Sequence, residues 1–337
     1  MDRETEGARM NTRDRLLRLL EGNRERFVSG ERLAETLGVS RNAVWKAVRA
    51  LREEGYVIDA ATNRGYRLAQ ENDLLSPAGI ERFLPERHPF DIVVRKRVDS
   101  TNAEARRRAL EGAAEGTVIV AEEQRAGRGR PGKRFYSPPG SGVYLSVVLR
   151  PTLPADRGQL LTCAAAVAGA RAIERVCGCE ALIKWVNDIY MDGRKVAGIL
   201  TEGMVDIESG RFEHAVMGIG VNAKMPAAGF PAELADVAGA VADGAGAVRA
   251  ELAATILEEF WRLYERIEER RFFEEYRRRC FLLGQPVVVA RDGSRVRARA
   301  VDLDDDFRLV VELPDKTRLA LPYGEVSAGR GAPPLQS

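Results

Sequence analysis

The segment from Gly127 to Phe135, GRGRPGKRF, places four cationic side chains among three glycines. It misses the ATP-binding pattern G-x-x-x-x-G-K-[ST] by one residue, because Arg134 takes the position of the hydroxyl that binds Mg²⁺. That pattern also requires a helix directly after the loop, whereas Pro138 and Pro139 prevent one from starting there. The segment is therefore not a P-loop. Its glycines and cations still suit a loop that folds over an anion, with a plain basic surface loop as the alternative.

A second polar group, the quartet DSTN at 99–102, follows a strand-like run at 92–98. It precedes an alanine- and arginine-rich helix that ends near Leu110. One residue of the quartet should cap that helix, and capping by itself would account for Ser100 and Thr101.

Three further motifs lie in or beside strand-like segments. They are KWVND at 184–188, RKVAGIL at 194–200 and GIGVN at 218–222. The sequence predicts a long helix within 154–176 and strands at 117–122, 142–149, 181–185, 196–202 and 215–221. This alternation without a G-x-G-x-x-G opening indicates a mixed α/β block, from 91 to about 280, that does not bind a dinucleotide.

The first seventy residues are predicted to form a unit of their own, ahead of a linker at 71–77. Leucine spacing predicts helices at 12–20 and 30–37, and Ser40 is a good N-cap for a third helix that ends near Gly55.

The details of this unit indicate a winged helix-turn-helix. Ala34, Gly38 and Val44 supply the small residue, the tight turn and the apolar plug that the motif needs. The stretch YVIDAATNRGYRL at 56–68 predicts a hairpin wing, with its turn near Asn63-Arg64-Gly65.

The outward face of the third helix is basic and carries no acid between Ser40 and Arg52. Side chains of this kind bind phosphates and read base edges. The residues predicted to contact DNA are Gly30, Ser40, Arg41, Asn42, Trp45, Lys46 and Arg49, with Arg52 on the same face. The alternative is a winged-helix module that binds another protein.

The tail changes character again and predicts a small SH3-like β-barrel. Short strands are expected at 286–290, 295–301, 308–313 and 318–321, with turns at Asp292-Gly293 and at 304–306. The domain limits are therefore 1–70, 71–280 and 281–337.

Composition sets mild limits on function. A net charge of +2 over 337 residues excludes a bulk polycation, so any contact with nucleic acid must be local. No apolar stretch approaches a membrane span, and Met1 to Asn11 lacks an apolar signal region, so we expect a cytoplasmic protein that binds no membrane. The four cysteines include a C-x-C pair that does not match zinc spacing, which predicts reduced thiols and no metal cage.

Taken together, the five motifs in this order resemble the biotin protein ligases, specifically the bifunctional kind that also represses biotin synthesis. The resemblance covers nearly the whole chain and implies a multidomain α+β protein. Its parts would be an N-terminal winged helix-turn-helix, a central mixed α/β catalytic domain of the biotin/lipoyl ligase type and a C-terminal SH3-like barrel. It also answers the question of the glycine-rich loop, which in this family closes over biotin and its adenylate without being a P-loop.

The resemblance implies roles for individual residues. The catalytic group would be Arg128, Arg130, Lys195 and Asp188, with Asp188 as the Mg²⁺ ligand. Biotin would contact Ser100, Thr101, Asn102, Gln124, Arg128, Gly129, Arg130, Lys195, Gly198 and Gly218. ATP would contact Gly127, Arg130, Lys133, Phe135, Lys184, Asn187 and Asn222.

The resemblance also implies an activity and partners. Biotin and Mg-ATP would give biotinyl-5′-AMP, and a lysine of a biotin carboxyl carrier domain would then take the biotin. The adenylate-bound protein would form a homodimer on operator DNA. Two alternatives remain open, a lipoyl or octanoyl ligase and a ligand-sensing repressor without ligase turnover.

Three positions depart from the family pattern. Val186 stands where the KWPND motif has proline, and Phe135 replaces a frequent tryptophan. Trp45 lies on the recognition helix where smaller polar residues are common, so the operator sequence is not predicted.

Overall fold

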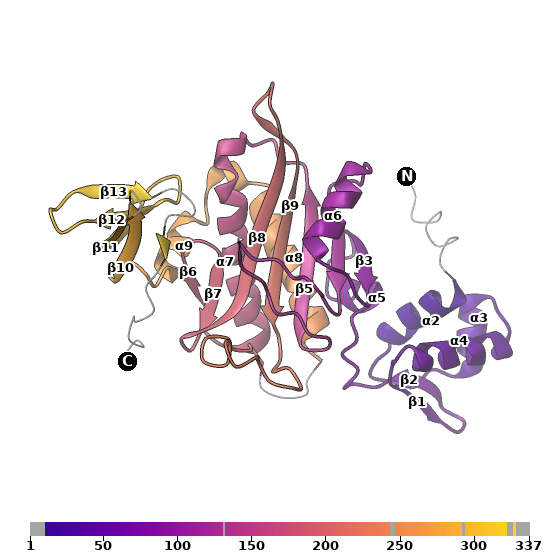
Figure 1. The fold of residues 1–337 in the computed structure, drawn as a ribbon. Coiled ribbons are helices and arrows are strands. Elements are labelled where there is room, and N and C mark those ends of the chain that lie inside the picture. Colours follow the sequence, from indigo (N-terminus) through magenta and orange to yellow (C-terminus); the bar gives the residue numbers. More distant parts are fainter. Residues whose placement is uncertain (1–10, 131, 243–246, 292–293, 322–325, 328–337) are drawn as a thin grey trace. The chain divides into compact units, whose positions relative to one another are not determined.

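The computed structural model describes residues 11–130, 132–242, 247–291, 294–321 and 326–327. The chain forms two compact units, drawn in Figure 1. The first comprises Met1–His88 with Gly244–Glu251, and the second comprises Pro89–Asp243 with Leu252–Ser337.

Three helices open the first unit: α2 (Thr12–Glu21), α3 (Gly30–Leu37) and α4 (Arg41–Glu53). Each begins after a polar N-cap whose side chain accepts from a backbone N–H in the first turn. The caps are Asn11, Ser29 and Ser40. The prediction of three helices in this unit is confirmed.

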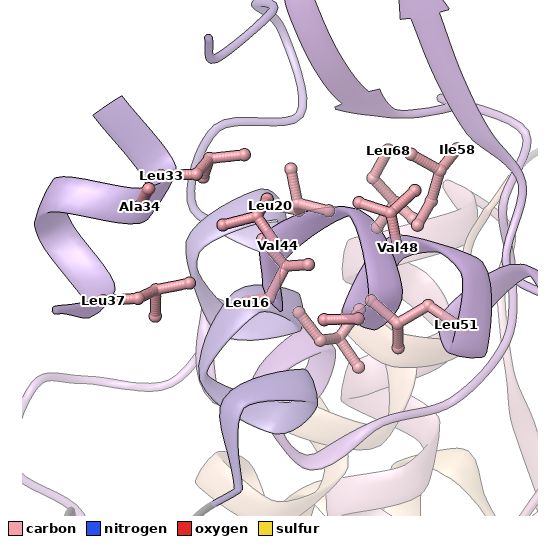
Figure 2. Close-up of a cluster of buried hydrophobic side chains, with 12 residues drawn as sticks. Leu16, Leu20, Leu33, Ala34, Leu37, Val44, Val48, Leu51, Ile58 and Leu68 are labelled. Atoms are coloured by element: carbon pink, nitrogen blue, oxygen red, sulfur yellow. The ribbon is translucent and has the colours of Figure 1, made fainter. Parts of the chain in front are cut away.

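A single apolar core holds these helices together (Figure 2). Leucines of α2 and α3 and valines of α4 meet in it, and the strands contribute Ile58 and Leu68. Ala34 and Val44 are buried in this core, and Gly38 adopts the left-handed conformation (φ 65°) that ends α3. The predicted roles of these three residues are therefore confirmed.

The wing is a hairpin of β1 (Ile58–Ala61) and β2 (Gly65–Leu68), paired antiparallel. Gly65 has φ 102°, and a Cβ there would lie 2.0 Å from the carbonyl oxygen of Val28, so glycine is required. Arg52 of α4 is exposed, as predicted, and its guanidinium also donates to the carbonyl of Ile58 (2.6 Å), which ties α4 to the wing.

Residues 71–88, expected to begin with a linker, pack into the first unit. Val57 N–H donates to the buried Asn72 side chain (3.0 Å), and Leu75 is buried just before α5 (Pro77–Glu81). Asp73 accepts from the buried guanidinium of Arg249 at 2.9 Å. Hydrogen bonds and burial, which composition does not reveal, make this segment part of the domain.

The second unit is built on a seven-stranded mixed sheet, in the order β3-β4-β5-β9-β8-β7-β6. Only the β3–β4 pair is parallel. The strands are β3 (Asp91–Arg95), β4 (Thr117–Ala121), β5 (Gly142–Leu149), β6 (Leu182–Lys184), β7 (Asp188–Met191), β8 (Arg194–Asp206) and β9 (Arg211–Asn222).

Two helices cover opposite faces of this sheet. Side chains alternate along each strand, so residues 216 and 219 of β9 point to opposite faces. Val216 of β9 packs in a cluster with Ala105 of α6 (Thr101–Leu110). Ile219, which points the other way, closely approaches Gly169 of α7 (Gln159–Cys177). The face under α6 is the one that carries the candidate site.

Charged pairs join the remaining helices to α7. The Arg171 side chain of α7 donates to Glu259 of α8 (Arg249–Tyr264) at 3.2 Å and to Glu275 of α9 (Phe273–Arg279) at 2.5 Å. Two short 3₁₀ turns, Ala155–Arg157 and Ile267–Glu269, complete the helical elements of the described residues.

The C-terminal part is a small antiparallel sheet in the order β13-β12-β11-β10-β14, which confirms the predicted β domain. Its strands are β10 (Pro286–Arg291), β11 (Ser294–Leu303), β12 (Leu309–Glu312), β13 (Arg318–Leu321) and β14 (Val326–Ser327). The indole N–H of Trp185 donates to the carbonyl of Phe307 (2.7 Å), which connects this sheet to the KWVND motif. The predicted Asp292-Gly293 turn lies outside the described residues.

The four cysteines are free thiols. Among the described residues, none of the helices is both long enough and apolar enough to span a bilayer.

Candidate functional site

A pocket lies on the α6 face of the large sheet, where the motifs from distant parts of the chain meet. Loop and helix residues form one side, and glycines of β8 and β9 form its floor. It is lined by Ser100, Thr101, Asn102, Gln124, Arg128, Phe135, Gly198, Leu200, Gly218, Ile219 and Gly220. Seven of the predicted biotin-contacting residues are thus together in one cavity.

A chain of hydrogen bonds orders the polar wall of this pocket. Gln124 Oε1 accepts from the backbone N–H of Thr101 (2.8 Å) and lies 3.1 Å from its hydroxyl. Ser146 Oγ lies 2.8 Å from Thr101 Oγ1 and 2.6 Å from Asn102 Oδ1. Ser100 occupies the N-cap position of α6, but its side chain makes no capping bond. Gln124 satisfies the helix N-terminus instead, so capping does not explain the Ser100 side chain.

The floor of the pocket consists of glycines because its neighbours approach too closely for a side chain. A Cβ on Gly218 would lie 1.9 Å from Asn102 Oδ1, and one on Gly220 would lie 2.6 Å from the Phe135 ring. A Cβ on Gly198 would lie 3.3 Å from Lys195 Nζ. Gly220 lies within β9 and faces the pocket.

We expect Gly218→Ala to lower affinity for the pocket's ligand by at least about tenfold, because the methyl group must displace the Asn102 amide. Overpacking of this kind typically costs about 1–3 kcal/mol. Isothermal titration with biotin measures the effect. Gly22→Ala is the control for loss of a glycine, because Gly22 lies in the first unit with φ −71° and a Cβ there would make only ordinary contacts. Equal affinity in Gly218→Ala and the wild type would contradict the prediction.

The glycine-rich loop closes on itself as a short hairpin. Phe135 N–H donates to the carbonyl of Gly127 (3.0 Å), and Gly129 N–H donates to the carbonyl of Lys133 (3.0 Å). A Cβ on Gly127 would lie 2.3 Å from the Phe135 carbonyl oxygen, so glycine permits this pairing. The hairpin directs Phe135 into the pocket and leaves Arg128 half-exposed, 3.8 Å from Glu202.

A cluster of charges lies beside the pocket. Lys195 Nζ is 2.6 Å from Asp188 Oδ1 on the neighbouring strand. Burial lowers the pKa of Lys184, and the positive charges of Lys195 and Arg130 lower it further, against the opposing effect of Asp188. Burial, with a smaller effect of Asp188, raises the pKa of Tyr190 to about 12. Lys184 thus lies within electrostatic range of two other cations and one carboxylate, and this excess of positive charge favours an anion.

Of the seven predicted ATP contacts only Phe135 lines the pocket, and the other six lie outside its lining: Gly127, Arg130, Lys133, Lys184, Asn187 and Asn222. Asn187 is buried and its amide donates to the carbonyl of Ile199 (2.8 Å), while Asn222 donates to the carbonyl of Gly239 (3.0 Å). Lys133 is exposed at the tip of the hairpin. Asn187 and Asn222 therefore hold backbone segments together in this structure, and the Trp185–Val186 peptide before Asn187 is cis.

Ser146 contacts two residues of the pocket wall and was not among the residues predicted from the sequence. It lies inside the apolar strand β5, is fully buried, and bonds both Thr101 and Asn102. A hydroxyl in an otherwise apolar strand is a weak signal, and only the pairing of Ser146 with Gly218 aims it at the pocket.

The predicted DNA-contacting face lies in the first unit. Arg41, Asn42, Trp45, Lys46 and Arg49 are all exposed on α4, and the Arg49 guanidinium lies 5.4 Å from the Trp45 ring centroid. Ser40 caps α4, and Gly30 starts α3 with Tyr66 close by. Exposed cations around an exposed indole suit a phosphate backbone.

Comparison with known proteins shows that three parts of the chain each match a protein family. The family models that match are the HTH domain over residues 12–67, the biotin/lipoate A/B protein ligase family over 94–222, and the biotin protein ligase C-terminal domain over 282–329. The bifunctional ligase/repressor BirA of Bacillus subtilis is 37% identical over 242 residues, which cover 71% of this chain and 73% of that protein. The chain belongs to the bifunctional ligase/repressor family of biotin protein ligases.

Other members of this family are also similar. The biotin–[acetyl-CoA-carboxylase] ligase of Paracoccus denitrificans is 34% identical and aligns over 69% of this chain and 98% of its own. The structure of the Aquifex aeolicus biotin protein ligase in complex with biotin and ATP superimposes with a TM-score of 0.57 at 24% identity, over 72% of this chain and 99% of that one. This last likeness supports the fold of the part of the chain that it covers.

Proposed function

We propose that this protein is a biotin protein ligase that works in two steps. The biotin carboxylate attacks the α-phosphorus of ATP to give biotinyl-5′-AMP and pyrophosphate, and a lysine amine of a carrier domain then displaces AMP from the mixed anhydride. The main observation behind the proposal is that a polar pocket lies directly beside a cluster of cationic side chains. The pocket wall, which includes Ser100, Thr101 and Gln124, suits a neutral ring with amide-like groups, and the cluster suits a carboxylate and a phosphate.

The reaction concentrates negative charge, and fixed cations stabilise it as it develops. Lys195 Nζ lies beside Gly198 at the pocket floor, where the biotin carboxylate would end. Arg128 and Arg130 on the hairpin would close on the carboxylate and the α-phosphate, and Gly129 would let the loop backbone approach them. Phe135 lies against Gly220 and Gly198 and would make an aromatic contact with adenine.

Mg²⁺ would enter with ATP. Among the described residues there is no group of three His, Cys, Asp or Glu side chains that could form a cage. Magnesium, however, commonly binds through one or two carboxylates together with substrate phosphates. Asp188 fits as that single carboxylate, and the ion would neutralise the departing pyrophosphate.

We further propose that the adenylate-bound protein represses transcription. The exposed basic face of α4 would enter a major groove, and a homodimer would present two such faces to an inverted-repeat operator. A division into a DNA-binding unit, a catalytic domain and a C-terminal domain from residue 281, with the first boundary moved from residue 70 to His88, belongs to the same proposal, as does a cytoplasmic site of action.

The test is incubation of the protein with ATP, Mg²⁺, biotin and a biotin carboxyl carrier domain, followed by a streptavidin blot. Biotinylated carrier supports the proposal. Parallel reactions with lipoate and octanoate distinguish the related ligases, and turnover of either acid without turnover of biotin would refute it.

For the DNA-binding half, Lys46→Ala should weaken binding to all sequences alike. If Lys46 contacts one phosphate, the slope of log K against log salt should fall by about one unit. Asn42→Ala should instead relax discrimination at one base pair. Gel shifts at several salt concentrations, with and without biotin plus ATP, measure both effects, and an unchanged slope would remove Lys46 from the interface.

A further inference from the structure

Glu202 of β8 contacts both the pocket wall and the glycine-rich hairpin. Its Oε2 accepts from Asn102 Nδ2 at 2.9 Å, and its Oε1 lies 3.8 Å from Arg128 Nη1. Its side chain is 28% exposed, so the carboxylate is partly withdrawn from water.

Both amide hydrogens of Asn102 are engaged in this arrangement. Nδ2 donates to the carbonyl of Leu200 (3.1 Å) as well as to Glu202, and Oδ1 lies 2.6 Å from Ser146 Oγ. Asn102 thus has no amide hydrogen left for a ligand. The side chain shapes the wall beside Gly218, and the carboxylate fixes which of its ends faces Ser146.

The contact with Arg128 is of a different kind. A 3.8 Å pair whose side chains are 46% and 28% exposed is weak. It restrains the guanidinium near the pocket while leaving it free to exchange onto a carboxylate or phosphate.

We propose that Glu202 is a positioning residue of the biotin site, which acts by orienting Asn102 and, more weakly, by holding Arg128 near the pocket. This inference rests on the proposed ligase function. Because Glu202 acts on a wall that is the same in the ground state and the transition state, its loss should alter KM for biotin more than kcat.

The first test measures biotin-dependent ATP–pyrophosphate exchange by the full chain. Glu202→Ala should raise KM for biotin about tenfold, the cost of removing a hydrogen bond to a charged group, with kcat within about twofold. Glu202→Gln should stay within about threefold of wild type, because its amide oxygen still accepts from Asn102. Glu213→Gln, an exposed glutamate on β9, is the matched control and should behave as wild type.

A second test does not depend on Glu202→Ala being folded. Asn102→Asp places two carboxylates together and should raise KM strongly. In the double variant Asn102→Asp/Glu202→Gln, the amide introduced at position 202 can donate to the carboxylate introduced at position 102. This restores the hydrogen bond in the opposite direction, so KM for biotin should fall below that of Asn102→Asp alone. A KM that Glu202→Ala leaves unchanged, or a double variant no better than Asn102→Asp, overturns the inference. Absence of exchange in the wild type would instead refute the ligase proposal itself.

Discussion

Replacing Lys195 with alanine should reduce the rate of adenylate formation by about 10²–10³-fold, the usual cost of removing one donor aimed at developing negative charge. Lys195 is held 2.6 Å from Asp188 and close to Gly198 at the pocket floor, so its ammonium is fixed before substrate arrives. Biotin-dependent pyrophosphate exchange measures the loss, and biotin affinity should fall as well.

The fold should survive this substitution, because the Lys195 side chain is one-third exposed. Lys316→Ala, an exposed lysine of the C-terminal sheet, is the control and should leave exchange unaffected. Removal of Lys195 should also raise the pKa of Lys184, since the Lys195 charge contributes to lowering it. Wild-type exchange in Lys195→Ala would show that this lysine has only a structural role.

Replacing Arg130 with glycine should release the adenylate rather than block its formation. Arg130 is half-buried and forms no ion pair with any of the described residues. Its positive charge nevertheless lies close enough to Lys184 to lower the pKa of that lysine. A ligand anion would therefore supply the missing partner. Loss of one member of such a pair typically costs about 2–5 kcal/mol, so the adenylate should dissociate roughly 30-fold faster or more.

The released adenylate should label lysines of bystander proteins, which a streptavidin blot of added serum albumin detects. Arg134→Gly, in the same hairpin but exposed, is the matched control and should retain specific labelling. If Arg130→Gly makes no adenylate in pyrophosphate exchange, Arg130 is required for the chemical step and its proposed role in retention is wrong.

The sequence by itself determined the winged helix and the family. The helices at 12–21, 30–37 and 41–53 follow from leucine and valine spacing and from three local caps, which act within a few residues. The five motifs in their order were sufficient to identify the family, because glycines and cations at fixed spacing can be recognised in the sequence alone.

Tertiary structure alone decided how the pocket is built. Asn102 meets Ser146 and Glu202 across 44 and 100 residues of chain, and these contacts depend on the register of β5, β8 and β9. The same register places Gly220 against the Phe135 ring. It also lets the Asn187 amide donate to the carbonyl of Ile199 in β8 instead of facing the pocket. Residues 71–88 belong to the first unit for a similar reason, because the Asp73–Arg249 contact joins positions 176 residues apart. The spacing of residues within a short segment carries no information about such long-range contacts. These contacts stabilise the fold only once the strands and helices have packed together.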